Sequence, residues 1–315
     1  MNEFLHNGSQ NCEQGSMRSM LTQNEFDLLY VLSDKTERLS QRQMAELMGW
    51  SLGKVNKLLK AFTDAGLYDG NTITQRGLEA LEPYRVKRAV FIAAGFGSRL
   101  APITLNTPKP LIRVNGKRII DTMLDAVAAA EIPEVIIVRG YMGEEFDLLR
   151  YKYPNIKFVE NPLYNEYNNI SSAMCVRFQL QNAYVMDADL ILNNPKVIRK
   201  YEYSSNLLAF PTKRTDDWCV TTDKSGFVDS VSVGGVNCYR MVGIFYWSQA
   251  DGARLAEDLQ AVYQSPGGKE RLWEHTPLIY KKEHYKVALR LCEETDVTEV
   301  DTFSELKKID RSYDI

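Results

Sequence analysis

The feature that most constrains the fold is an apolar run that stops at two glycines, in the stretch AVFIAAGFGSRL from Ala89 to Leu100. A short apolar segment bounded by turn formers predicts a buried first strand. A Gly-x-Gly pair directly after such a strand lets the backbone approach a bound group, with amide groups directed at phosphate oxygens. Position 100 is Leu, so the third glycine of the dinucleotide fingerprint is missing, and no Gly-Lys-Ser or Gly-Lys-Thr follows to form a Walker loop. Neither of those two nucleotide sites is therefore predicted.

Further apolar runs alternate with helical segments from residue 87 onwards, namely AVFIAA, EVIIVRG, KFVEN, AYVMDAD and NLLAF. Alternation of this kind predicts an α/β domain whose strands are mostly parallel. We therefore expect a Rossmann-like α/β domain over residues 87–315, built on a mixed and mostly parallel sheet. The polar segment EPYRVK, 82–87, is the expected boundary with the region before it.

A helical pattern fills the region before that boundary. From Leu21 the apolar residues recur with a helical period, Ser40 and Gln43 form a capping-box pattern, and LYDGNTITQRGLEAL indicates a turn, a wing and a closing helix. Residues 21–85 resemble a small winged helix-turn-helix domain of the kind found in bacterial regulators. The polar residues 1–20 are predicted to form a disordered leader.

The third predicted helix of this domain carries three lysines, Lys54, Lys57 and Lys60. Positive charge at that place is typical of a recognition helix facing phosphates, which makes DNA a candidate partner. Two alternatives stay open: the lysines are the solvated side of an amphipathic helix, or the domain serves protein interaction.

Composition excludes several classes of protein. A net charge of −3 argues against nucleic-acid binding over the whole surface, and five cysteines without a CxxC pair do not form a predicted disulfide framework. Three histidines make a His-rich zinc site unexpected. No apolar run approaches the roughly 18 residues of a membrane helix, and the polar start is unlike a signal peptide. We expect a cytoplasmic protein without membrane insertion; nothing in the sequence indicates its oligomeric state.

The stretch after the first predicted strand carries a longer pattern. Ala-Ala-Gly-x-Gly-Ser-Arg is followed by Pro-Lys-Pro-Leu, with the arginine and the lysine ten positions apart, at 99 and 109. This pattern resembles the signature of the nucleotidyltransferases that make NDP-sugars and CDP-alcohols, over most of residues 87–315. The resemblance implies that Arg99 and Lys109 hold the triphosphate and act as catalytic residues. It also implies a nucleotide-binding set of Ala93, Ala94, Gly95, Gly97, Ser98, Arg99 and Lys109.

Chemistry of this kind requires a divalent ion, and Mg²⁺ prefers carboxylate oxygens together with substrate phosphates. Asp187 and Asp189 follow the apolar run YVM, where a parallel sheet presents its ligand-binding edge, and Asp301 lies at a second strand end. The family places metal-binding aspartates at both positions. The resemblance therefore implies Mg²⁺ on Asp189 and Asp301, with Asp187 in support.

Other stretches are similar to the choline-phosphate cytidylyltransferases of the bacterial LicC type. They are GYMGEEFDLL, NPLYNEYNNISSAM, YVMDADLIL, DDWCV and RLWEHTPLIY. Since a quaternary ammonium is held over aromatic faces, tryptophans in these stretches are candidate choline ligands. The resemblance implies a substrate-binding set of Asn169, Ser171, Asp217, Trp218, Trp273 and Glu274, with Asn168, Tyr239, Tyr246 and Trp247 as further candidates.

The resulting prediction is a cytidylyltransferase whose partners are CTP and phosphocholine. The phosphocholine oxygen would attack the α-phosphorus of CTP in line, forming CDP-choline and pyrophosphate. One alternative is a sugar-1-phosphate nucleotidyltransferase on the same scaffold. Another is a winged-helix transcriptional regulator whose transferase-like domain senses a nucleotide. CTP and choline follow from the resemblance, since the residues themselves fix neither the nucleobase nor the acceptor.

Overall fold

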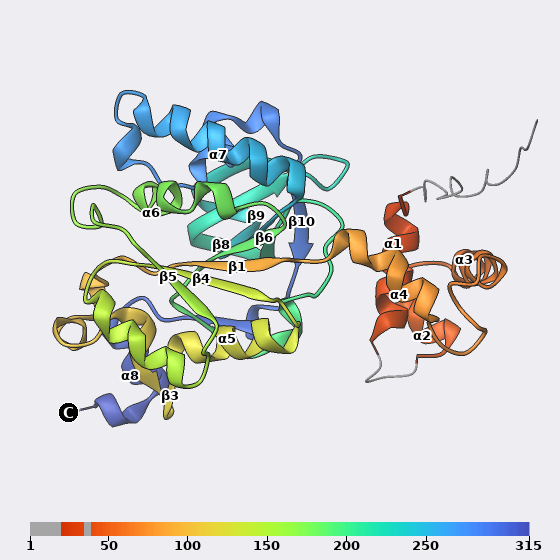
Figure 1. Cartoon of the computed structure of the whole chain (residues 1–315), viewed down its shortest axis with the longest axis horizontal. Coiled ribbons are helices and arrows are strands. Elements are labelled where there is room, and N and C mark those ends of the chain that lie inside the picture. Colours follow the sequence, from red (N-terminus) through yellow and green to blue (C-terminus); the bar gives the residue numbers. More distant parts are fainter. Residues whose placement is uncertain (1–19, 35–38, 315) are drawn as a thin grey trace, which may run out of the picture. The chain divides into compact units, whose positions relative to one another are not determined.

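The computed structural model of the chain describes residues 20–34 and 39–314, so the predicted leader over residues 1–20 lies outside the described residues except for Met20. The chain divides into two compact units, Met1–Pro83 and Tyr84–Ile315 (Figure 1). This division falls within the polar segment 82–87. No helix in the described residues combines the length and the apolar character needed to cross a membrane.

The N-terminal unit contains four helices, α1 (Gln23–Ser33), α2 (Gln41–Leu47), α3 (Leu52–Asp64) and α4 (Gln75–Leu81). Thr22 and Ser40 begin the first two helices with capping boxes, each accepting a backbone amide three residues on. Between α3 and α4 one antiparallel bridge joins Tyr68 to Ile73, at the position of the predicted wing. The helices enclose a small apolar core of Phe26, Leu28, Leu29, Val55, Leu59, Phe62 and Leu81.

The C-terminal unit is built on a seven-stranded sheet in the order β10-β8-β9-β6-β1-β4-β5. β1 pairs in parallel with β4 and β6, whereas β9 runs antiparallel to both β6 and β8. The strands are β1 (Arg88–Ile92), β4 (Glu134–Arg139), β5 (Ile156–Glu160), β6 (Ala183–Asp187), β8 (Asn206–Thr222), β9 (Val228–Trp247) and β10 (Ala288–Leu291). The predicted mixed and mostly parallel sheet is confirmed.

Helices cover both faces of this sheet (Figure 1). They are α5 (Ile119–Ala129) on one face and α6 (Ile170–Cys175) and α7 (Gln249–Gln264) on the other. Because neighbouring residues of a strand face opposite sides, Ala89 and Phe91 pack with α5 while Val90 packs with α6 and α7. β1 is thus buried on both faces, which explains its continuous apolar run.

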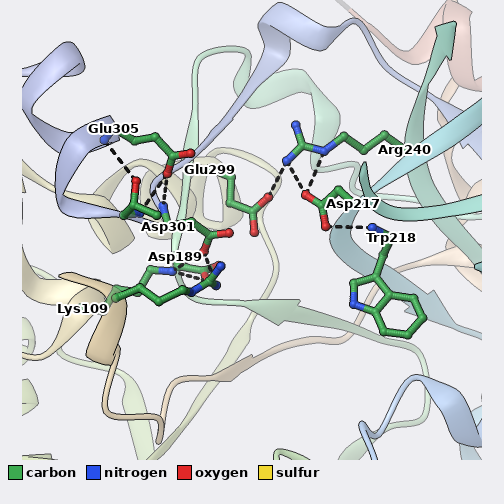
Figure 2. Close-up of polar contacts among 10 residues, drawn as sticks. Lys109, Asp189, Asp217, Trp218, Arg240, Glu299, Asp301 and Glu305 are labelled. Carbon is green, nitrogen blue, oxygen red and sulfur yellow. Dashed lines mark hydrogen bonds and ion pairs between the residues drawn. The ribbon is translucent and has the colours of Figure 1, made fainter. Parts of the chain in front are cut away.

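Smaller elements gather beyond the carboxyl ends of β1 and β6. They are the pairs β7 (Leu190–Leu192) with β11 (Val297–Glu299) and β2 (Arg113–Val114) with β3 (Lys117–Arg118), followed by α8 (Phe303–Ile309). Asp301 lies between β11 and α8. The Glu305 carboxylate of α8 accepts the backbone amides of Asp301 and Thr302, which fixes the main chain at Asp301 (Figure 2).

The long strands β8 and β9 form a bent hairpin beside β6. Cys219 pairs with both Ser232 and Arg240, so the outer part of β8 lies between two segments of β9. Shifts of register accompany this bend, including one between Thr215 and Trp218. The bend brings residues Asp217 and Trp218 near the end of β6, where they line one cavity with Asp187.

Candidate active site

The glycine loop after β1 packs against Lys109. Gly97 has a φ of +67°, and a Cβ there would lie 3.0 Å from the Cβ of Lys109. A side chain at Gly97 would therefore be strained and would push against Lys109. Ala93 and Ala94 are buried under the loop, whereas Gly95, Ser98 and Arg99 are exposed. The loop thus presents backbone and the Arg99 side chain to solvent at the carboxyl end of β1.

Lys109 connects two of the predicted metal-binding aspartates. Its Nζ lies 2.8 Å from Asp189 Oδ2 and 2.9 Å from Asp301 Oδ1. Arg99 Nη2 donates to the same Oδ1 of Asp301 at 2.8 Å. Burial alone would lower the pKa of Lys109, but the two aspartates overcome this and raise it. Four predicted residues from distant parts of the chain therefore converge on one point.

A third carboxylate joins this point and was not predicted. Asp189, Glu299 and Asp301 each offer an oxygen, and these oxygens lie within 4.8 Å of one another. Asp189 Oδ1 is buried and has no hydrogen-bond partner among the described residues. Carboxylate oxygens at this spacing, together with an unpartnered buried oxygen on Asp189, fit a hard divalent cation such as Mg²⁺. We call this group the acidic cluster.

The sequence contains a signal for Glu299 in the segment TEVDT. Glu299 and Asp301 are two positions apart at a strand end, and residues spaced by two project from the same face of an extended chain. Asp187, the remaining predicted aspartate, is not part of the acidic cluster. It lies at the end of β6, two residues before Asp189, and its side chain points into a neighbouring cavity.

This cavity, of about 70 Å³, is the second part of the site. A Cβ at Gly243 would lie 2.3 Å from Asp187 Oδ2, so the glycine makes room for that carboxylate. Trp218 and His275 line the cavity with their ring centroids 4.7 Å apart. The full lining is Asp187, Leu190, Asp217, Trp218, Val231, Met241, Val242, Gly243, Phe245, Glu274, His275, Leu278 and Glu299.

Three carboxyl groups of the cavity have perturbed proton affinities. Burial, followed by the charges of Glu274 and Asp189, raises the pKa of Asp187 well above its ordinary value. Burial raises the pKa of Glu274 to about 7. Burial and the charge of Asp189 raise the pKa of Glu299 to about 8, although Arg240 opposes this. Negative charge in the cavity is therefore unfavourable until a cation enters.

Asp217 and Glu299 are held by one guanidinium, that of Arg240 on β9 (Figure 2). Asp217 also accepts the backbone amide of Trp218 at 2.8 Å. By contrast, Asp187 and Glu274 form no ion pair within residues 20–34 and 39–314. The cavity thus contains two carboxyl groups that are available to a ligand.

The other predicted substrate-binding residues support the cavity from outside. Asn169 accepts the backbone amide of Trp273 at 2.8 Å, and its own amide lies 3.4 Å from the Glu274 carboxylate. Ser171 is buried, accepts from Asn161 and donates to the carbonyl of Asn168.

The predicted aromatic residues separate into two groups. Trp273 is only 1% exposed, and its ring packs against Phe245 and Trp247 in the core, so it does not line the cavity. Tyr246 and Trp247 are buried in the core as well, and Tyr239 packs against it. Of these tryptophans and tyrosines, Trp218 alone lines the cavity.

Comparison with known proteins gives two family matches. A nucleotidyl transferase model matches residues 88–224, and a winged helix-turn-helix DNA-binding model matches residues 21–67. A 2-aminoethylphosphonate cytidylyltransferase of Lancefieldella rimae is 33% identical over 71% of this chain and 92% of its own length. A choline-phosphate cytidylyltransferase of Streptococcus pneumoniae is 28% identical over 71% of this chain and 96% of its own length.

Solved structures give the same likeness. The CTP:phosphocholine cytidylyltransferase LicC from Streptococcus pneumoniae superposes with a TM-score of 0.66 at 27% identity, over 72% of this chain and 99% of that one. An inositol-1-phosphate CTP transferase from T. maritima, at 16% identity and a TM-score of 0.56, shares the fold. The resemblances predicted for both parts of the sequence are confirmed.

Proposed function

Since the chain belongs to the nucleotidyl transferase family, with cytidylyltransferases among its relatives, we propose that it transfers CMP from CTP to a small acceptor. This acceptor combines a phosphate or phosphonate with a cationic head group. The observation that carries the proposal is the cavity beside the acidic cluster, with Trp218 and two carboxyl groups, Asp187 and Glu274, that form no ion pair in the described residues. An indole face and free carboxylates attract a cation, whereas they offer little to an uncharged sugar ring.

In the proposed reaction an acceptor oxygen attacks the α-phosphorus of CTP. A new phosphorus–oxygen bond forms, the bond to the bridging oxygen of the β-phosphate breaks, and pyrophosphate leaves. Lys109 and Arg99 exchange their carboxylate partners for phosphate oxygens and neutralise the charge that develops there. The loop 93–97 supplies backbone amides to the triphosphate.

The acidic cluster of Asp189, Glu299 and Asp301 would hold Mg²⁺, with Asp187 behind it. When bound, the ion would neutralise charge on the phosphate oxygens of the nucleotide. The three carboxylates would serve only to hold the ion, whereas Lys109 and Arg99 are the groups of the chain itself that contact the phosphate oxygens.

Phosphocholine is the acceptor that the sequence predicts, with Trp218 as its aromatic partner. The same cavity favours a second candidate, 2-aminoethylphosphonate. A primary ammonium donates hydrogen bonds that Asp187 and Glu274 can accept, and a trimethylammonium has none to donate. The relative from Lancefieldella rimae is named for this phosphonate.

Pyrophosphate release with four nucleoside triphosphates and a panel of acceptors tests the proposal. The panel contains phosphocholine, phosphoethanolamine, 2-aminoethylphosphonate and glucose-1-phosphate. We expect turnover with CTP and a cationic acceptor, its loss with EDTA and its return with Mg²⁺. The preferred acceptor decides between choline and a primary amine. Preference for glucose-1-phosphate would overturn the cationic acceptor, and binding of CTP without any turnover would support the nucleotide-sensing regulator instead.

For the N-terminal unit we propose DNA binding through α3. Lys57 and Lys60 are exposed on this helix, while Lys54 Nζ lies 3.5 Å above the ring of Trp50. If the lysines face phosphates, replacing each one should reduce the slope of log affinity against log salt concentration by roughly one. Fluorescence anisotropy with duplex DNA at two salt concentrations measures this, and binding that is absent or insensitive to Lys57→Ala and Lys60→Ala would contradict it.

A further inference from the structure

Arg240 joins the two parts of the site (Figure 2). Its Nη2 donates to Asp217 Oδ2 at 2.7 Å and to Glu299 Oε2 at 3.0 Å, and its Nε donates to Asp217 Oδ2 at 3.1 Å. Asp217 precedes Trp218 and accepts its backbone amide. Glu299 belongs to the acidic cluster. One side chain therefore connects the wall of the cavity to the carboxylates beside it.

We propose that Arg240 is a positioning residue, which fixes Trp218 relative to the acidic cluster through Asp217 and Glu299. This inference rests on the proposed function, because it assigns the cavity to the acceptor and the acidic cluster to the nucleotide. Arg240 itself does not line the cavity and acts only through its two carboxylate partners.

The surroundings of Arg240 are suited to this role. It lies on β9, paired with Phe210 and Cys219, and its guanidinium stands 5.7 Å from the centre of the Phe210 ring. A rigid sheet thus fixes the base of the side chain. In the described part of the chain, Asp217 and Glu299 form ion pairs with no other basic residue. Without Arg240 the two carboxylates would repel each other and would lose their common anchor.

The guanidinium contacts both carboxylates through Nη2, and its Nε is a second donor to Asp217. Arginine presents these N–H groups in a fixed fork, whereas lysine offers one compact ammonium on a flexible stem. Arg240→Lys should therefore lose the second donor to Asp217 and the fixed geometry, and restore only part of the function. Arg240→Met removes both contacts while keeping much of the side-chain length.

Steady-state kinetics of the full chain test the positioning role. For Arg240→Met we expect the KM for the acceptor to rise about tenfold and kcat to fall, with Arg240→Lys in between; loss of a charged hydrogen bond is worth about that much. The KM for CTP should rise less than that for the acceptor, because Glu299 alone of the acidic cluster contacts Arg240, while Lys109 keeps its contacts with Asp189 and Asp301. Arg214→Met is the matched control, since Arg214 is an exposed arginine on the same hairpin.

A double-mutant cycle separates positioning from a loss of stability. If Arg240 acts on Trp218 through Asp217, then Asp217→Asn combined with Arg240→Met should raise the acceptor KM no further than Arg240→Met alone. Effects that multiply would overturn the proposal. So would a variant whose melting temperature falls while its kinetic constants stay unchanged, or one that loses CTP affinity as strongly as acceptor affinity.

Tryptophan fluorescence tests the same role without turnover. The difference between each protein and its Trp218→Phe counterpart isolates the emission of Trp218. Loss of Arg240 should shift this emission to the red, because a released indole meets more water, and the shift should be absent with Arg214→Met. An unchanged Trp218 emission would overturn the positioning role. Absence of turnover by the unaltered chain would instead overturn the proposed function alone.

Discussion

Lys109 occupies the place of a cation between two carboxylates, and its removal gives the sharpest test of the acidic cluster. Its Nζ lies 2.8 Å from Asp189 and 2.9 Å from Asp301. We expect Lys109→Met to lose turnover yet to bind divalent cations more tightly than the unaltered chain. The reason is that the lysine ammonium competes with such an ion for the same oxygens.

The magnitude follows from the burial of this ion pair. Removing one partner of a fully buried pair costs about 3–5 kcal/mol, because the other charge stays buried and unpaired. The side chain of Lys109 is 11% exposed, while those of Asp189 and Asp301 are 25% and 19% exposed. Partial solvation lowers the expected cost to about 2–3 kcal/mol. For a unit of this size, that loss lowers the melting temperature by roughly 5–10 °C.

A divalent cation should recover this loss. In the Lys109→Met protein a divalent ion binds without displacing the lysine, so its binding free energy becomes more favourable by up to about the same 2–3 kcal/mol. Since 1.4 kcal/mol is a factor of ten, Mn²⁺ should bind about tenfold to a hundredfold more tightly. Thermal unfolding of the full chain with and without Mn²⁺ measures both effects. Catalysis should fall by about 10²–10³, the usual loss when one such donor is removed.

Lys117→Met is the matched control for this experiment, because Lys117 is exposed on β3. It should change neither the melting temperature nor the response to Mn²⁺. The reasoning would be refuted by a Lys109→Met protein that unfolds at the normal temperature and gains no extra stability from Mn²⁺. Turnover close to that of the unaltered chain would remove Lys109 from the catalytic machinery.

Four further outcomes are expected. Glu299→Gln should weaken Mn²⁺ binding, measured by paramagnetic resonance of the free ion, and unchanged affinity would exclude this carboxylate from the metal site. Trp218→Ala should raise the acceptor KM with little change for CTP, whereas Trp273→Ala should mainly lower stability, by about 3–5 kcal/mol for a buried tryptophan, as thermal unfolding would show. Burial raises the pKa of Glu274 to about 7, so it is neutral below and ionised above that pH; acceptor KM should fall between pH 6 and pH 8, and Glu274→Gln should abolish this change. A chain that begins at Tyr84 should fold and retain activity, and insolubility would show that the N-terminal unit belongs to the transferase core.

Much of the C-terminal fold could be predicted because its central strands have a simple sequence signal. β1, buried on both faces, is a continuous apolar run, and its carboxyl end carries the glycine loop. The outer part of the long hairpin of β8 and β9 had no such signal, since NLLAF marks only the start of β8. The outer residues are largely exposed and the register shifts several times, so neither alternation nor apolar runs mark this part.

The same contrast explains which site residues were predicted. Arg99, Asp189 and Asp301 lie shortly after strands, and Lys109 lies in the Pro-Lys-Pro segment of the same motif as Arg99. The structure brings the four together. Arg240 lies in no motif. Its role depends on a bend in the hairpin that only the folded chain displays.

The charges of the site explain why a metal ion and a cationic acceptor belong to the same proposal. Among the described residues, the acidic cluster and the cavity contain six carboxyl groups, and the permanently charged basic side chains that pair with them are those of Arg99, Lys109 and Arg240. Without ligands, the excess charge is reduced by protons, as the raised pKa values of Glu274 and Glu299 indicate. A bound nucleoside triphosphate would bring further negative charge and would draw Lys109 and Arg99 away from their aspartates. The carboxylates then require other cations, which a divalent ion supplies on one side and an ammonium head group on the other. An acceptor without that positive charge would leave Asp187 and Glu274 to compete for protons, and for this reason we expect the cavity to discriminate against sugar phosphates.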